Sequence, residues 1–154
     1  MSFLELKIPP PIISLLTALV MGALAAWSQA PLGLPLLGRS VVAAPLMAGA
    51  VSIFLYSGRQ LVNAGTTWRP GDPSQTTSLV VAGLYRFSRN PIYLAWLLAL
   101  TAWGLLLNDG LALAPLPAFV LYMTRFQIIP EERALEKLFG DQYLNYKRQV
   151  RRWL

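Results

Sequence analysis

The chain has 154 residues, of which 55% are hydrophobic and only 13% charged, and its mean hydropathy is +0.49. A soluble domain carries about 25% charged residues, so this composition excludes an ordinary soluble fold and predicts one integral membrane domain over residues 1–154. The sequence contains no cysteine and no histidine, which excludes disulfides, thiolate chemistry and the commonest metal ligand and general base. We therefore expect no metal site.

Four apolar stretches predict four membrane-spanning helices, over residues 10–30, 40–62, 91–107 and 110–129. A spanning helix needs about 20 residues. The charge-free intervals that hold the first three stretches are long enough, whereas the fourth reaches full length only if Arg125 lies inside the helix, near its end. The expected fold is an all-α polytopic membrane bundle. Small residues at 48–52 permit close helix contact, either within the bundle or in an oligomer.

Proline, glycine and asparagine divide the second half of the chain into helices. Pro91 suits the first turn of the third span, and the sequence from Asn108 to Gly110 predicts a tight turn into the fourth span. The third and fourth spans should therefore form an antiparallel hairpin that ends at Pro130. Two further helices are expected on the cytosolic side, within residues 131–152.

The basic residues predict the orientation in the membrane. They gather in the loop that contains Arg59, Arg69, Arg86 and Arg89 and in the C-terminal tail. Under the positive-inside rule both termini are then cytoplasmic, in a multi-pass protein of a cell membrane that we expect to be microbial. The net charge of +6 also favours contact with anionic lipid in the bilayer. No basic and aromatic pattern indicates nucleic acid.

Two polar clusters flank the predicted hairpin on its cytosolic side: Tyr85, Arg86, Arg89, Asn90 and Tyr93 in one, and Arg125, Gln127, Glu131 and Glu132 in the other. Each residue alone has an ordinary interpretation, as a membrane anchor, an interfacial aromatic or a helix-start carboxylate. Ionisable groups at membrane depth are nevertheless candidates for function. Because antiparallel spans bring the two clusters together, we expect them to form one site, in which Arg89 or Arg125 pairs with Glu131 or Glu132.

The order and spacing of these residues resemble a known family, the integral membrane methyltransferases typified by isoprenylcysteine carboxyl methyltransferase and the phospholipid methyltransferases. The resemblance covers residues 77–150 and rests on Leu79-Val80, Gly83-x-Tyr85, Arg89-Asn90-Pro91-x-Tyr93, Glu131-Glu132 and Phe139-Gly140-x-x-Tyr143-x-x-Tyr146. It implies that S-adenosyl-L-methionine is the methyl donor, S-adenosyl-L-homocysteine the product, and a lipophilic molecule in the membrane the acceptor. The methyl group would pass in line from the sulfonium to an oxygen, nitrogen or sulfur atom.

The resemblance, together with the chemistry of the donor, implies a set of cofactor-binding residues: Thr77, Ser78, Leu79, Val80, Tyr85, Arg89, Asn90, Pro91, Ile92, Tyr93 and Glu131. Within this set, Glu131 suits the ammonium or ribose hydroxyls of the donor and Arg89 suits its carboxylate. The tyrosines suit the sulfonium through cation–π contact. A G-x-G motif of the soluble nucleotide-binding type is absent from the sequence.

The acceptor stays open between an isoprenylcysteine carboxylate, the nitrogen of phosphatidylethanolamine, a thiol and another lipophilic small molecule. The prenylcysteine branch of the family has an arginine four residues before the first glutamate, where this chain has Gln127, with Arg125 two residues earlier. We expect these two residues on the acceptor side. Arg125, Glu132 and Tyr93 are the catalytic candidates, the last two as bases for an amine. There are two competing interpretations. One is an NADPH-dependent reductase of related fold, although the phosphates of NADPH would require more clustered arginines. The other is a non-catalytic membrane subunit.

Overall fold

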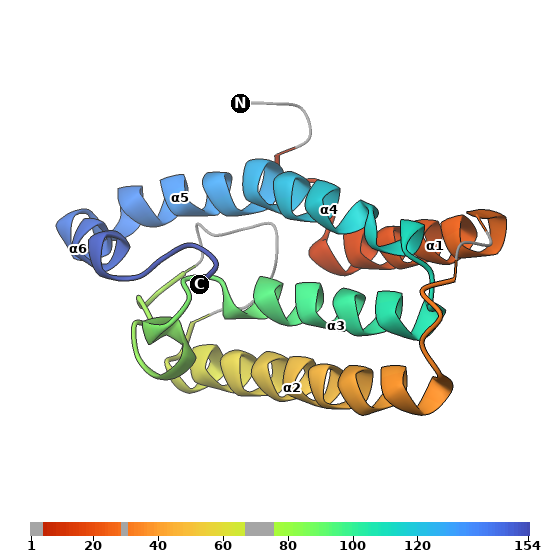
Figure 1. Cartoon of the computed structure of the whole chain (residues 1–154). Coiled ribbons are helices and arrows are strands. Elements are labelled where there is room, and N and C mark those ends of the chain that lie inside the picture. Colours follow the sequence, from red (N-terminus) through yellow and green to blue (C-terminus); the bar gives the residue numbers. More distant parts are fainter. Residues whose placement is uncertain (1–4, 29–30, 67–75) are drawn as a thin grey trace.

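The computed structural model describes residues 5–28, 31–66 and 76–154, and their regular secondary structure is helical apart from one isolated bridge between Pro31 and Asp109. Arg69 of the predicted cytoplasmic loop lies outside the described residues. The elements, shown in Figure 1, are α1 (Pro10–Ser28), α2 (Leu36–Asn63), η2 (Gly83–Arg86), α3 (Pro91–Leu107), η3 (Leu111–Leu113), α4 (Pro115–Met123), η4 (Thr124–Ile128), α5 (Ile129–Phe139) and α6 (Asp141–Gln149).

The predicted helical membrane bundle is confirmed. Three helices are long and apolar enough to cross a membrane: Pro10–Ser28, Leu36–Asn63 and the run Leu111–Phe139. The fourth apolar helix, α3, has 17 residues and lies beside α2 in Figure 1. Its predicted start at Pro91 and end at residue 107 match the structure, because Pro91 occupies the first turn and Asn108 adopts a left-handed conformation (φ 57°) that ends the helix.

Small side chains let α2 and α3 pack closely. Ala43, Ala50 and Ser57 are buried on α2 at intervals of seven residues, close to two helical turns, and so share one face. Ala95 and Ala102 repeat this spacing on α3. Within the stretch 48–52, where we expected close contact, only Ala50 is buried, since the phase of the helix turns its neighbours away.

The prediction that the fourth span ends at Pro130 is wrong, because the helix continues to Phe139. A proline has no N–H for the carbonyl four residues earlier, which here belongs to Phe126. Two features compensate. The helix widens into the π-helical turn η4 just before the proline, and the backbone N–H of Leu6 donates to the Phe126 carbonyl at 3.0 Å. A segment 120 residues away thus supplies the missing donor.

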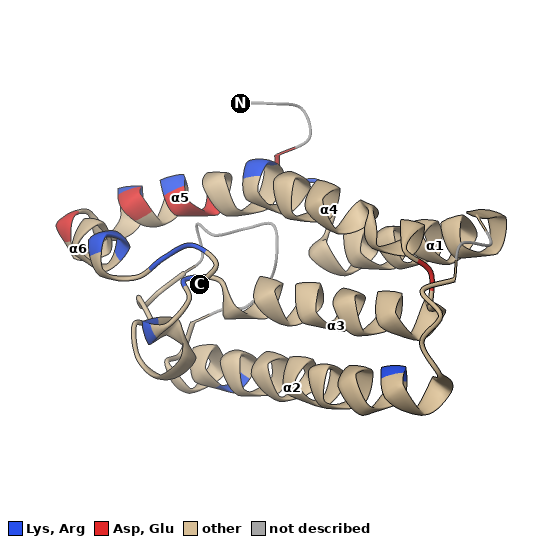
Figure 2. Cartoon of the chain, viewed as in Figure 1, with Lys and Arg blue, Asp and Glu red and all other residues tan. Residues whose placement is uncertain are grey.

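The C-terminal helix is also shorter than the predicted limit of residue 152. α6 ends at Gln149, and Val150 is extended (φ −122°, ψ 133°). The following residues turn back toward the start of α3, where the carbonyl of Arg151 accepts a hydrogen bond from the backbone N–H of Arg89 at 3.0 Å. Tertiary hydrogen bonds thus replace the last helical turn. Figure 2 shows that acidic and basic residues gather at this end of the bundle, along α5, α6 and the tail.

Candidate functional site

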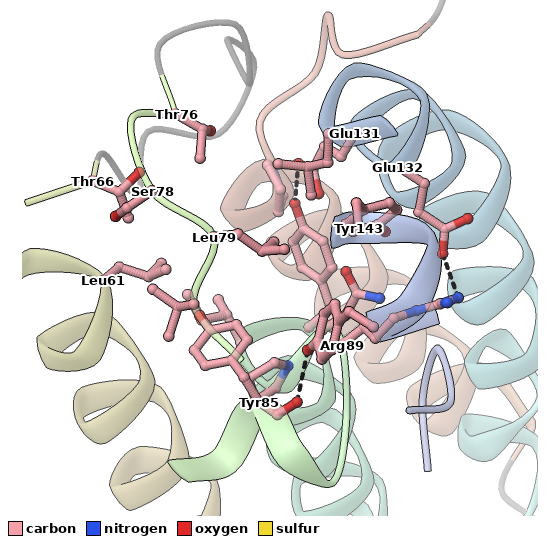
Figure 3. A pocket seen from close by; sticks show the side chains of 18 of the residues that line it. Leu61, Thr66, Thr76, Ser78, Leu79, Tyr85, Arg89, Glu131, Glu132 and Tyr143 are labelled. Atoms are coloured by element: carbon pink, nitrogen blue, oxygen red, sulfur yellow. Dashed lines mark hydrogen bonds and ion pairs between the residues drawn. The ribbon is translucent and has the colours of Figure 1, made fainter. Parts of the chain in front are cut away.

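A cavity with a volume of about 190 Å³ lies at the charged end of the bundle, between the start of α3, the end of α2, α5 and α6 (Figure 3). This is more than ten times the space that one water molecule needs, so the cavity can hold part of a small molecule. Its lining is Pro10, Pro11, Phe54, Leu61, Thr66, Thr76, Ser78, Leu79, Val80, Tyr85, Arg89, Asn90, Pro91, Ile92, Tyr93, Trp96, Glu131, Glu132, Leu135, Tyr143 and Tyr146.

The cavity lining is polar in one part and apolar in another. Arg89, Glu131 and Glu132 supply charge where α3 begins and α5 passes. Phe54 on α2 and Trp96 on α3 supply an apolar wall, with their rings edge to face and 5.7 Å apart. The apolar wall is thus built by helices of the bundle that face each other, and the polar part by the loops and helices at its end.

Tyr93 and Glu131 join α3 to α5 at the cavity. The Tyr93 hydroxyl donates a hydrogen bond of 2.5 Å to Oε1 of Glu131, and Tyr93 is buried. Both residues come from the two clusters that we expected to meet. The α3–α4 hairpin therefore does bring the start of one predicted span to the end of the other.

Glu132 lies beside Glu131 but is bound to two arginines. Its Oε1 accepts from Arg89 Nη2 at 2.7 Å and from Arg152 Nε at 2.9 Å, and its Oε2 accepts from Arg152 Nη2 at 2.8 Å. The side chains of Arg89 and Glu132 are each only 7% exposed, so this ion pair is buried. Hydrogen bonding to Glu132 raises the pKa of Arg152 above its usual value. The pair that we expected is therefore Arg89 with Glu132, with Arg152 as a third member.

Arg89 also forms hydrogen bonds that hold the tail and α6 in place. Its Nη1 donates to the carbonyl of Lys147 at 3.1 Å, and the side chain of the next residue, Asn90, donates through Nδ2 to the carbonyl of Arg152 at 3.0 Å. In the described part of the chain, the buried Nε–H of Arg89 has no hydrogen-bond partner. Because that N–H is closed to the cavity as well as to solvent, it is an unsatisfied donor inside the buried ion pair.

Two hydrogen bonds of the Gln60 side chain hold the turn that carries Tyr85. Gln60 of α2 donates through Nε2 to the Ala82 carbonyl and accepts through Oε1 from the Leu84 N–H, at 3.1 and 3.2 Å. Gly83 between them has φ +59°, and a Cβ there would lie 1.9 Å from Nε2 of Gln60. Only glycine fits this position without strain or displacement.

Aromatic hydroxyls next to this turn stay neutral. Tyr146 donates to the carbonyl of Tyr85 at 2.6 Å. Burial raises the pKa of Tyr85, Tyr143 and Tyr146 well above the usual value for tyrosine. All three are therefore uncharged phenols in the cavity wall.

A family model described as phospholipid methyltransferase matches residues 38–142, which is more than half of the chain. The chain belongs to this family. The match contains all of α2 except its first two residues, the α3–α4 hairpin and both glutamates of the site. The predicted resemblance to the isoprenylcysteine and phospholipid methyltransferases is thereby confirmed.

Two curated relatives extend the comparison. A protein of Haemophilus influenzae described as uncharacterized is 49% identical over 63 residues, 41% of this chain and the whole of that protein. Methanethiol S-methyltransferase 1 of Bradyrhizobium diazoefficiens is 37% identical over 67 residues, 44% of this chain but only 22% of that protein. No solved structure matches. Family and relative together support methyl transfer as the class of activity.

Most of the cofactor-binding residues expected for a phospholipid methyltransferase line the cavity: Ser78, Leu79, Val80, Tyr85, Arg89, Asn90, Pro91, Ile92, Tyr93 and Glu131. Glu132, a catalytic candidate, lines it too. Thr77 does not, since its hydroxyl donates to the Gly65 carbonyl and its N–H donates to the Thr66 hydroxyl. Thr77 instead holds the loop against the end of α2.

Arg125 and Gln127, expected on the acceptor side, lie away from the cavity lining. Arg125 donates to Glu5 at 2.8 Å, and the amide of the buried Gln127 donates to the Ile8 carbonyl at 2.7 Å. They dock the N-terminal segment on η4. Because their hydrogen-bond partners belong to the N-terminal segment, both side chains are held there and not at the cavity lining.

Some lining residues were not identified as site residues from the sequence. Phe54, Leu61 and Trp96 read as ordinary span residues, and no local signal separates them from other apolar positions. Tyr143 and Tyr146 were part of the family motif, so their spacing was a usable signal. Arg152, which lies beside the cavity, had been grouped with the basic tail.

Proposed function

We propose that the protein is an S-adenosyl-L-methionine-dependent methyltransferase that acts on a lipophilic acceptor in the membrane. The observation that carries the proposal is a cavity whose lining has both a charged part and an apolar part between bundle helices. A methyltransferase of this kind must bring a charged, water-soluble donor against an acceptor that lives in lipid. One cavity that offers both environments supports that pairing.

The charged part suits the donor. The carboxylate of Glu131 can accept further hydrogen bonds besides the one from Tyr93, and these could come from an ammonium or a ribose hydroxyl. The guanidinium of Arg89, which lines the cavity, suits the donor's carboxylate. Faces of Tyr85 and Trp96 are suited to a sulfonium. When bound, the donor supplies an electrophilic methyl group, and the residues of the chain orient it and exclude water.

The acceptor end favours an uncharged or weakly polar head. Among the described lining residues Arg89 is the basic one, and Glu132 already neutralises it. An acceptor carboxylate therefore finds less support here than a thiol or an amine, and the methanethiol S-methyltransferase relative adds weight to sulfur. An NADPH reductase also finds less support, because its phosphates need several cations.

A proton acceptor is required for an amine or a thiol. Glu132 is poorly suited, since two arginines occupy both its oxygens. Tyr93 is better placed, because it lines the cavity and its hydroxyl donates to the carboxylate of Glu131, which can take up the proton that the phenol passes on.

The membrane orientation is part of the proposal. The cavity lies at the end of the bundle that carries the charges of α5, α6 and the tail (Figure 2). By the positive-inside rule this end faces the cytosol, where the donor is dissolved. The acceptor would enter sideways from the bilayer.

Calorimetric binding of S-adenosylhomocysteine to the detergent-purified protein tests the donor assignment, with NADPH in parallel. We expect binding of the first ligand only, and a weaker affinity for Glu131→Gln than for Glu136→Gln, a matched change of an acid outside the cavity lining. Binding of NADPH alone would favour the reductase. Binding of neither ligand by folded protein would favour the non-catalytic subunit.

Transfer of a labelled methyl group to octanethiol, octylamine and octanoate then sorts the acceptor class. These probes share one chain and differ in the head group. Turnover of the thiol or the amine above the carboxylate is expected, and a preference for octanoate would contradict the argument from Arg89 and Glu132.

A further inference from the structure

The apolar part of the cavity ends at one pair of aromatic rings. Phe54 of α2 and Trp96 of α3 both line the cavity, and their rings lie edge to face with centroids 5.7 Å apart. Among the described lining residues, none on α2 precedes Phe54 and none on α3 follows Trp96. Because α2 and α3 run antiparallel and side by side (Figure 1), this pair is the part of their lining that lies furthest from the charged end of the bundle.

The ring pair lies well inside the two helices. At 1.5 Å per residue, Phe54 precedes the end of α2 at Asn63 by about 14 Å. On the same basis Trp96 follows the start of α3 at Pro91 by about 8 Å. No charged residue of the described lining lies on α2 or α3, so the amino-acid part of the donor finds no partner at this depth. The group that belongs against the rings is therefore the alkyl part of the acceptor.

The space beside the rings is limited. The cavity has a volume of about 190 Å³, whereas sites that bury a drug-sized ligand have about 300–1,000 Å³. Small buried side chains, Ala50 and Ser57 on α2 and Ala95 on α3, bring the two helices close together next to the pair. The side chain of Phe54 therefore closes this end of the cavity, and its size decides how long a chain fits.

We propose that Phe54, packed on Trp96, is a specificity-determining residue for methyl transfer: it limits the apolar tail of the acceptor, which is a short-chain thiol or amine and not a long-chain lipid. This inference rests on the proposed function. A change in the size of residue 54 should change the preferred length of the acceptor and leave binding of the donor as it is.

The experiment measures kcat/KM for transfer of a labelled methyl group to straight-chain thiols and amines, from ethyl to dodecyl, by the full-length protein in detergent. The wild-type value should rise with chain length, pass through a maximum and fall. Phe54→Ala should move the maximum to longer chains, and Phe54→Trp should move it to shorter ones. In each variant the ratio of kcat/KM for a long and a short chain on either side of the wild-type maximum should change about tenfold or more, because one methylene group in a hydrophobic pocket is worth about 10-fold to 200-fold.

The two substitutions control for each other, because a general loosening of the cavity would not move the maximum in opposite directions. Partition of the acceptors into detergent is the same for every variant and cancels in the comparison. Tyr56→Ala should keep the wild-type profile, since Tyr56 is 52% exposed on the same helix and is absent from the cavity lining. The affinity for S-adenosylhomocysteine should stay within about twofold throughout, well below the factor of ten that 1.4 kcal/mol represents.

A maximum that stays in place in both Phe54 variants, or a wild-type rate that never falls with chain length, would overturn the inference. A loss of S-adenosylhomocysteine affinity in both variants would also overturn it, because the rings would then hold the nucleoside of the donor. The same holds if the wild type binds S-adenosylhomocysteine and methylates neither series. If the wild type does not bind S-adenosylhomocysteine, the proposed function itself fails, which is a different result.

Discussion

Removal of the Glu132 charge should destabilise the protein strongly, and Glu132→Gln tests this with little change of shape. Both side chains are 7% exposed, and the carboxylate accepts three hydrogen bonds from two arginines. The substitution leaves the Arg89 charge buried without its counter-ion. Removing one partner of a buried pair costs about 3–5 kcal/mol, because the other charge stays desolvated.

Arg152 adds little to that cost, since its side chain is one third exposed and water can solvate it. For a chain of this size about 1 kcal/mol shifts the melting temperature by 2–4 °C, so Glu132→Gln should lower it by about 6–20 °C. The assay is thermal unfolding of the detergent-solubilised protein, followed by intrinsic fluorescence.

The control is Glu136→Gln, one turn further along α5. Glu136 pairs with Lys147, and the two side chains are 32% and 37% exposed, so the change should cost at most about 1 kcal/mol. Equal melting temperatures for the two variants would refute the argument that burial makes the Arg89–Glu132 pair important.

Four further predictions concern the cavity and its surroundings. Tyr93→Phe should lower kcat by about 100-fold or more, as loss of a proton acceptor does, with S-adenosylhomocysteine affinity within a few-fold in calorimetry; unchanged kcat would remove Tyr93 from the chemistry. Gly83→Ala should destabilise the protein by about 1–2 kcal/mol for its positive φ, and by more if Gln60 is displaced, whereas Gly58→Ala, in open space on α2, should not destabilise it; similar melting temperatures would contradict this. Tyr146→Phe should cost about 1–3 kcal/mol, because the buried Tyr85 carbonyl loses its donor, and the exposed Tyr56→Phe should not. Arg125→Ala should change methyl transfer little, since Arg125 pairs with Glu5 away from the cavity lining; a selective loss of acceptor turnover would return Arg125 to the acceptor site.

Local signals predicted the parts of the fold that local forces determine. The helix predicted over residues 91–107 was correct at both ends because Pro91 and Asn108 each act through their own backbone. The same logic failed at Pro130, where a hydrogen bond from Leu6 and a π turn remove the usual cost of a proline within a helix. No pattern near Pro130 reports a donor 120 residues away.

The candidate site shows the same division. The meeting of Tyr93 with Glu131 followed from the antiparallel hairpin, which sequence spacing can predict. Arg152 could not be assigned in this way, because its position depends on a tail that leaves α6 and turns back. Tertiary contacts of this kind leave no periodic trace in the sequence.

Because the C-terminal tail folds back onto the start of α3, the site can be completed only at the end of synthesis. Asn90 and Arg152 are 62 residues apart in the chain, and at about 5–20 residues per second the ribosome needs roughly 3–12 s to add the second after the first. Throughout that interval Arg89 and Asn90 have been synthesised, but the tail residues that bind them have not. The bundle helices can therefore enter the bilayer before the cavity has its final form, and completion of the site becomes a late step of biogenesis.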